Sequence, residues 1–279
     1  MKETLLFLST PMVAGILLAL MLGYFGTHIL RRGIIFIDIA IAQLAALGTM
    51  VGLLLGFAEE SIQVQVFSYL LTLLVIGAFA FLKPKATPIP TEAIIGIIYC
   101  IGLAMAILLA EKIPGGSNYI TKTITGNILW VTWKKVINLG LLFAGMGLIH
   151  IWPGKSFNQI SDEVCNGKQS FNMKLKLMNL IFYITFGVVV VKTVLIGGIF
   201  LVFTLLIAPS AAAALFFQSW KNRLIFSWVM GVIGTVAGIM LSYSMNISNG
   251  PAVVCLLGIL VFTLAFIKLI SPRSANSVT

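Results

Sequence analysis

Long apolar segments separated by short polar gaps run along almost the whole chain. They cover residues 10–30, 34–56, 63–82, 92–110, 136–152, 175–191, 193–208, 224–243 and 251–270. A helix rises 1.5 Å per residue, so segments of this length can cross the hydrocarbon core of a bilayer. The pattern predicts an all-α integral membrane protein with nine transmembrane helices, or eight if the sixth and seventh segments form one span.

Composition supports a membrane protein and argues against a soluble one. Of 279 residues, 59% are hydrophobic and only 9% are charged. The two largest gaps, 111–135 and 153–174, are too short to bury a core of their own. We therefore expect residues 1–279 to form a single transmembrane domain, and we read the first apolar run as a retained span because no cleavage site follows it.

The lysines and arginines lie in the gaps between the apolar segments. With the N-terminus outside, twelve of them fall on the inner side and five on the outer side, and Lys192 occupies the outer turn between the sixth and seventh segments. This bias predicts a cytoplasmic C-terminus. Basic residues in such positions meet lipid headgroups, so the net charge of +10 does not indicate nucleic-acid binding.

The second apolar segment contains the carboxylate of Asp38 and the amide of Gln43. A charge in hydrocarbon is costly, so an intramembrane acid is a candidate functional group. The alternative is that Asp38 lies near the interface and pairs with Arg31 or Arg32. The same segment continues with Gly48, Gly52 and Gly56, which would share one helical face and allow close helix contact.

The segment 209–223 also departs from a simple span. Pro209 is expected to end the preceding helix, because proline lacks an N–H group and clashes with the previous turn. An alanine-rich stretch with high helix propensity follows at the inner face. It suits either contact with a cytoplasmic partner or an ordinary helix in a loop.

The cysteines, the histidines and the absence of known catalytic motifs argue against several kinds of site. Three cysteines without CxxC spacing support neither a disulfide framework nor a thiolate metal site. His28 and His150 lie near span ends, where interfacial positions are expected. A P-loop, an HExxH motif and a GxSxG motif are absent from the sequence, so ATP hydrolysis would belong to another chain.

Six short motifs, in order, resemble the membrane permease of ABC importers for zinc, manganese or iron. They are Leu30-Arg-Arg-Gly-Ile-Ile-Phe, Glu92-Ala-Ile-Ile-Gly96, Gly126-Asn127-Ile128-Leu129, Asp162-Glu163 with Gly167, Leu205-Leu-Ile-Ala-Pro209-Ser-Ala-Ala and Ser248-Asn-Gly250-Pro251. The similarity covers nearly the whole length.

One departure from the family concerns the metal site. Members of known specificity carry an aspartate and, one turn later, a histidine in the second span. Alignment on Gly48 puts Ile39 and Gln43 at these positions and leaves Asp38 about 100° around the helix. Glu92 matches an acidic position at the start of the fourth span. The carboxylates and the amide favour harder ions such as manganese or magnesium, so the cargo stays open between a weakly coordinated metal and a metal complex.

The resemblance implies a homodimer in a bacterial inner membrane, a separate cytoplasmic ATPase and an extracytoplasmic substrate-binding protein, with no cofactor bound by this chain. Candidate residues of the substrate pathway are Asp38, Gln43, Glu92 and Asn127. Candidate residues for ATPase coupling are Pro209, Ser210, Ala211, Leu215 and Gln218.

Two other classes of protein remain as alternatives. An ion-coupled secondary transporter would carry paired membrane acids in inverted repeats, which the sequence does not display. An intramembrane enzyme or a scaffold would need a polar constellation near one span end and no ATPase partner.

Overall fold

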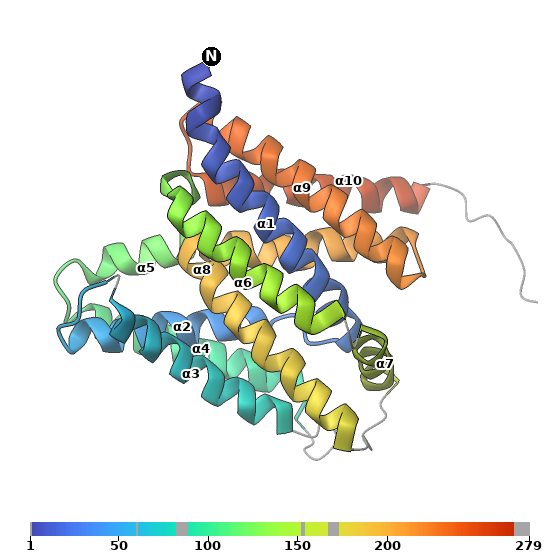
Figure 1. The fold of residues 1–279 in the computed structure, drawn as a ribbon, viewed down its shortest axis with the longest axis horizontal. Coiled ribbons are helices and arrows are strands. Elements are labelled where there is room, and N and C mark those ends of the chain that lie inside the picture. Colours follow the sequence, from blue (N-terminus) through green and yellow to red (C-terminus); the bar gives the residue numbers. More distant parts are fainter. Residues whose placement is uncertain (1, 60, 82–88, 152–153, 167–172, 271–279) are drawn as a thin grey trace, which may run out of the picture.

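The computed structural model describes residues 2–59, 61–81, 89–151, 154–166 and 173–270. Every regular element in these residues is helical, as the apolar pattern predicts (Figure 1). The elements are α1 (Lys2–Arg32), α2 (Ile37–Leu54), α3 (Ile62–Phe81), α4 (Thr91–Ala110), α5 (Gly116–Thr125), the 3₁₀ turn η1 (Ile128–Trp130), α6 (Trp133–Ile151), α7 (Gly154–Cys165), α8 (Met173–Phe216), α9 (Trp220–Met245) and α10 (Asn249–Ile270). Gly167 and four of the basic residues counted for orientation, Lys83, Lys85, Lys168 and Arg273, lie outside the described residues.

The long helices run between two ends of one bundle. At the first end, here named the Arg31 end, α1 ends and α2 begins. α4 also begins there, since Glu92 in its first turn accepts a 2.7 Å hydrogen bond from the backbone N–H of Ile35 in the α1–α2 turn. At the opposite end, named the Gly126 end, α5 and η1 lie beside the start of α10, where Gly250 packs on the carbonyl of Thr125. Among the described apolar helices, α2 and α8 are the most enclosed. α1 and α8 meet in a core of aromatic side chains that includes Phe25, Phe182 and Phe186.

The number of apolar helices differs from the nine or eight expected spans. Among the described residues, seven helices are long and apolar enough to cross a membrane, and the apolar stretch Ile62–Gly77 of α3 is shorter than these. The sixth and seventh apolar segments belong to one continuous element of 44 residues, α8.

α8 is divided into two arms at Gly198, whose backbone is not helical (φ 77°, ψ 164°). Both arms pass the same part of α1. Thr185 of the first arm bonds His150, which in turn bonds Tyr24 of α1, and Ser210 of the second arm donates to the carbonyl of Gly23 of α1. The chain therefore reverses at Gly198. The expected turn at Lys192 is wrong, because Lys192 lies inside the first arm.

Gly48 and Gly52 bring α2 into close contact with α3. A methyl group added at Gly48 would lie 2.5 Å from the carbonyl oxygen of Phe67, and one at Gly52 would lie 3.0 Å from Cα of Val64. Two hydrogen bonds cross the same contact, since Ser68 donates to the Ala45 carbonyl at 2.9 Å and lies 2.8 Å from the Thr49 hydroxyl. Small residues and interhelical hydrogen bonds are the usual means of packing helices in lipid.

Gly56 does not share this contact, contrary to the expectation that three glycines form one face. It lies beyond the end of α2 with φ +87° and with no atom within 4 Å of an added methyl group. The amide of Phe57 bonds back to the carbonyl of Gly52. This is the arrangement in which a left-handed glycine ends a helix, so Gly56 terminates α2.

We expect Gly48→Ala to lower stability by about 1–3 kcal/mol, because the added methyl group must push two backbones apart. Gly96→Ala is the matched control, since Gly96 also lies within a helix and has no atom within 4 Å of an added methyl group. Thermal unfolding of the purified variants in detergent measures the difference. Equal midpoints for the two variants would contradict the described α2–α3 contact.

Candidate functional site

Two carboxyl groups, of buried Asp38 and partly buried Glu92, lie at the Arg31 end on the first turns of α2 and α4; they are named here the carboxyl pair. Asp38 is 1% exposed. Glu92 accepts the 2.7 Å hydrogen bond from Ile35 through one oxygen, which holds the start of α4 against the α1–α2 turn. The other Glu92 oxygen and Oδ1 of Asp38 are buried and have no hydrogen-bond partner among the described residues. Glu92 binds the backbone of Ile35, three residues before Asp38, so the two groups lie at the same end of the bundle.

Neither arginine neutralises Asp38, so the expected alternative of a simple ion pair is wrong. Arg31 pairs with Asp162 of α7 at 2.8 Å. Arg32 donates to Ser161 at 3.0 Å and to Asn179 at 2.8 Å, and its guanidinium lies 3.8 Å from the ring centre of Phe182.

The environment of the carboxyl pair indicates what it can bind. Helix N-termini carry partial positive charge, which stabilises both groups. Two like charges with unused buried oxygens still favour an added cation over an empty site. Oxygen donors suit hard divalent ions. Three or more His, Cys, Asp or Glu side chains do not converge anywhere in the described part of the chain, so any ion here would need backbone oxygens or water as further ligands.

Gln43 lies further along α2, away from the carboxyl pair. It is 5% exposed and packs against Gly102 of α4. It lines a cavity of about 10 Å³ together with Thr123 and Ile124 of α5 and Ile199 of α8. Such a cavity is about the size of one water molecule.

Asn127 lies at the Gly126 end, separate from the other candidates. Its backbone N–H donates to the carbonyl of Ile196 at 3.2 Å, just before the break in α8. The structure therefore places Asp38 and Glu92 at the Arg31 end, Gln43 further along α2 and Asn127 at the Gly126 end.

The expected coupling segment has a different local structure. Pro209 does not end a helix, because α8 continues through it to Phe216. Ser210 lies 3.2 Å from Ser227 of α9, and Ala212 and Ala213 are fully buried. Close packing of these small residues explains why the helix tolerates the proline. Ala211 is partly buried.

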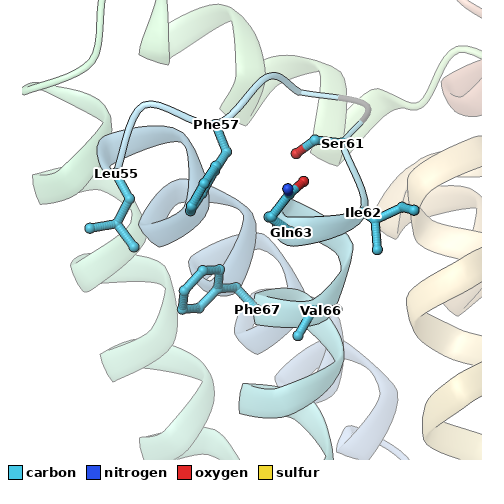
Figure 2. A pocket seen from close by; sticks show the side chains of 7 residues that line it. All are labelled: Leu55, Phe57, Ser61, Ile62, Gln63, Val66 and Phe67. Atoms are coloured by element: carbon cyan, nitrogen blue, oxygen red, sulfur yellow. The ribbon is translucent and has the colours of Figure 1, made fainter.

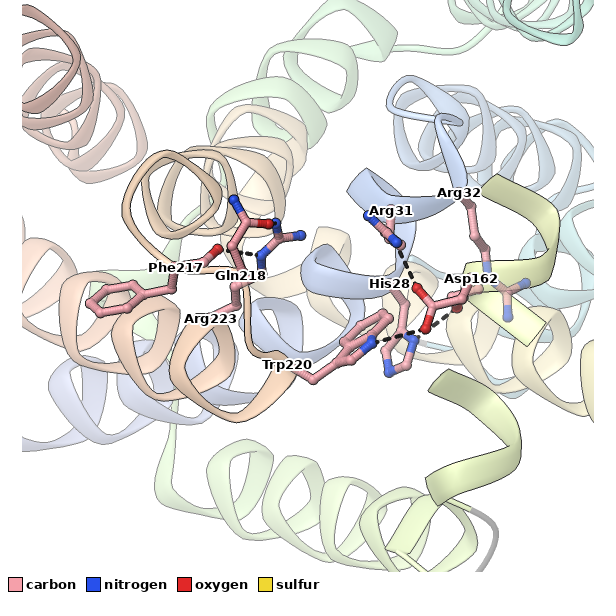
Figure 3. A network of polar contacts seen from close by, with 9 residues as sticks. His28, Arg31, Arg32, Asp162, Phe217, Gln218, Trp220 and Arg223 are labelled. Atoms are coloured by element: carbon pink, nitrogen blue, oxygen red, sulfur yellow. Dashed lines mark hydrogen bonds and ion pairs between the residues drawn. The ribbon is translucent and has the colours of Figure 1, made fainter. Parts of the chain in front are cut away.

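The exposed part of this region is the α8–α9 turn, which we define as residues 215–223. Leu215 is 42% exposed and Gln218 is exposed. Arg223 closes the turn by donating to the carbonyl of Phe217 at 2.7 Å (Figure 3).

A network of polar and aromatic side chains at the Arg31 end was not predicted from the sequence. His28 and His150 were expected at the interface, but they are 2% and 4% exposed. His28 bonds Ser161 of α7 at 3.0 Å, and its ring lies 4.9 Å from that of Trp220 in a tilted contact. His150 bonds Tyr24 and Thr185. The acidic motif that begins at Asp162 was visible in the sequence. Its partners were not, because they come from distant helices.

An open apolar pocket of about 560 Å³ lies at the Gly126 end, where α2 passes into α3 (Figure 2). Its seven lining residues include no ionisable side chain; they are Leu55, Phe57, Ser61, Ile62, Gln63, Val66 and Phe67. Because Asp38 lies at the other end of α2, this pocket is separate from the carboxyl pair.

Long apolar helices packed through small residues, with enclosed polar groups, define a polytopic helical membrane protein. The sequence model of the ABC 3 transport family matches residues 4–268, and the chain belongs to this family. The chain is 25% identical over 168 residues to a protein of Chlamydia trachomatis named "Probable metal transport system membrane protein". That match covers 60% of this chain and 57% of the relative, so the chain spans less than two-thirds of the relative's length.

Two other matches extend over most of the chain. The manganese import system permease protein ScaB of Streptococcus gordonii is 25% identical over 268 residues, which are 96% of this chain and 92% of the relative. A chain in the structure titled "PsaBC from Streptococcus pneumoniae in complex with Fab" has a TM-score of 0.73 at 23% identity and covers 94% of this chain and 95% of that one. This structural likeness confirms the fold.

Proposed function

We propose that this chain is the membrane-spanning subunit of an ABC importer for a divalent transition metal, driven by ATP hydrolysis on a separate subunit. The observation that carries the proposal is the carboxyl pair, in which Asp38 and Glu92 each have a buried oxygen without a hydrogen-bond partner among the described residues, in a chain of the ABC 3 transport family. The names of two relatives, a metal transport protein and a manganese import permease, support the same cargo class.

Manganese is the cargo that the donor set supports best. Asp38 and Glu92 offer carboxylate oxygens, and Gln43 offers an amide where the family carries a histidine. Imidazole favours zinc and iron, whereas oxygen ligands favour harder ions. We propose that the ion passes Asn127 and Gln43 and leaves by the carboxyl pair.

The ends of the bundle support an assignment of sides. The Arg31 end carries Arg31, Lys155, Lys221 and Lys268, so we assign it to the cytoplasm. With the reversal at Gly198 counted as a turn between two crossings and α3 as another, the chain crosses nine times, with the N-terminus outside. The α8–α9 turn then faces the cytoplasm.

The partners follow from these sides. The α8–α9 turn would dock on the ATPase, with exposed Leu215 and Gln218 in contact. Buried Pro209 and Ser210 and partly buried Ala211 would support them. A substrate-binding protein would deliver the ion at the Gly126 end. A second copy of the chain would complete the pathway in the inner membrane of a bacterium, and closure of the ATPases would alternate access between the two sides.

The test is purification of the tagged chain from its native membrane, followed by uptake measurements in proteoliposomes. We expect a nucleotide-binding subunit to co-purify and ATP to drive uptake of radioactive manganese, with excess unlabelled manganese competing better than zinc. Recovery without any ATPase, or ATP-independent uptake that follows an ion gradient, would contradict the proposal.

A further inference from the structure

The guanidinium of Arg32, the last residue of α1, carries a positive charge that pairs with no carboxylate among the described residues. Arg32 is 5% exposed, and its hydrogen-bond partners are the neutral side chains of Ser161 and Asn179. Asp162, which follows Ser161 in α7, is already engaged: one oxygen pairs with Arg31 and the other accepts an indole N–H (Figure 3). Enclosing a charge without a counter-ion is costly, so this position favours a bound anion.

One donor of the same guanidinium is unused. Nε of Arg32 donates to Ser161 at 3.0 Å and Nη1 donates to Asn179 at 2.8 Å, whereas Nη2 is buried and has no hydrogen-bond partner in the described part of the chain. The ring of Phe182 lies 3.8 Å from the guanidinium carbon, and such a contact stabilises a positive charge without neutralising it. Guanidinium N–H groups match the oxygens of a phosphate group, so an oxyanion of this class would satisfy both the charge and the free donor.

The surroundings of Arg32 follow one stripe of the first arm of α8 out to the surface. Asn179 and Tyr183 are one turn apart and both lie against the guanidinium, whose carbon is 5.3 Å from the ring centre of Tyr183. Lys176 lies one turn before Asn179, so it is on the same side of the helix. Asn179 is partly buried and Lys176 is exposed. The stripe therefore leads from the enclosed charge of Arg32, past a neutral amide, to a second positive charge that solvent and lipid can reach.

We propose that Arg32, Asn179 and Lys176 form a binding site for a phosphate group, carried either by an anionic lipid or by a free phosphate ion. Arg32 ends one membrane-spanning helix and Lys176 lies in the first turn of another, which is the level at which basic residues between helices meet lipid headgroups. A bound phosphate neutralises the guanidinium and holds the start of α8 against the end of α1. The site uses neither residue of the carboxyl pair, so it does not depend on the proposed function.

The experiment titrates the purified full chain in detergent with phosphatidylglycerol, phosphatidylcholine or inorganic phosphate. Native mass spectrometry counts bound lipid, and thermal unfolding follows the response to each ligand. We expect saturable binding of phosphatidylglycerol that Lys176→Gln weakens by about fivefold, the effect of removing one lysine beside a headgroup. Arg32→Gln should weaken binding by about tenfold or more, because it removes a charged hydrogen-bond donor. Phosphatidylcholine should bind less tightly than phosphatidylglycerol, because its ammonium group would lie beside Lys176.

Lys174→Gln is the matched control. It makes the same change of charge at an exposed position of the same helix, but Lys174 is two residues from Lys176 and so lies about 200° around the helix axis. Its affinity should equal that of the wild type. Lys176 is exposed, so Lys176→Gln tests the site even where Arg32→Gln fails to fold.

The two sources of the phosphate group give different results. A rise in unfolding temperature with phosphatidylglycerol alone assigns the site to a lipid, whereas an equal rise with inorganic phosphate assigns it to the free ion, provided that Lys176→Gln reduces the rise in either case. Equal affinities of Lys174→Gln and Lys176→Gln, or a wild-type chain that responds to neither ligand, would overturn the inference and leave the proposed function untouched.

Discussion

Replacement of Asp38 by Asn should abolish most transport while leaving the fold intact or more stable. A hydrogen bond or ligand bond to a charged group contributes about 1.5–3 kcal/mol, so we expect manganese uptake to fall by about 10- to 100-fold. Glu92→Gln should act in the same direction. The variant amides retain the shape of each side chain but cannot supply the negative charge that a divalent cargo needs.

Stability separates this interpretation from a structural role. Asp38 is buried and has an unused oxygen, so its charge opposes folding unless a cation is bound. Asp38→Asn should therefore unfold at the same temperature as the wild type or a higher one, which is the behaviour expected where a site trades stability for function.

Glu59→Gln is the control for general loss of a carboxylate. Glu59 pairs with Lys122 at 2.7 Å on the surface of the Gly126 end, and such pairs contribute little. Uptake by this variant should match the wild type. Normal uptake by Asp38→Asn and Glu92→Gln together would remove the carboxyl pair from the pathway.

The positions of most helices could be predicted because apolar length alone sets them. The expected span at 92–110 corresponds to Thr91–Ala110, and the one at 251–270 to Asn249–Ile270. The contact of Gly48 with α3 also follows from a local rule, since small residues let helices approach closely. Each of these features depends on the sequence of a single segment and on the lipid around it.

Features that depend on two distant segments could not be predicted. The ion-pair partner of Arg31 is Asp162, although Asp38 is much closer in sequence. Asp38 and Glu92 were each recognised as candidates, but their proximity depends on how α4 packs beside α2, where Gln43 meets Gly102. Pro209 was predicted to end a helix because of its local effect on the backbone. In the structure α8 continues through it, and its neighbours pack closely against other helices.

The reversal of α8 is the strongest case, because the Gly197-Gly198 pair is a turn signal but does not say which distant segment it meets. Gly198 lies inside an apolar run, and its conformation (φ 77°, ψ 164°) is one that essentially only glycine adopts. It packs directly on the backbone of Gly126, whose φ of +74° and ψ of 178° fall in the same region. The two glycines require each other, since a side chain on either would overlap the other's backbone.

We therefore expect Gly198→Ala to cost about 3 kcal/mol or more, from a forbidden backbone conformation and from overpacking together. Size-exclusion profiles and thermal unfolding in detergent should show loss of the folded, monodisperse protein. Gly126→Ala should give the same loss, because it disrupts the same junction from the other side.

Gly33→Ala is the matched control, because it tests the cost of a left-handed backbone at a position where an added methyl group meets no other atom. Gly33 has φ +68° but no atom within 4 Å of an added methyl group, so its cost should be limited to about 1–2 kcal/mol for a left-handed alanine. If Gly198→Ala were as stable as Gly33→Ala, the two arms of α8 could not meet Gly126 at a glycine-only junction. The proposed nine crossings, and the proposed cytoplasmic position of the α8–α9 turn, would then lose their physical basis.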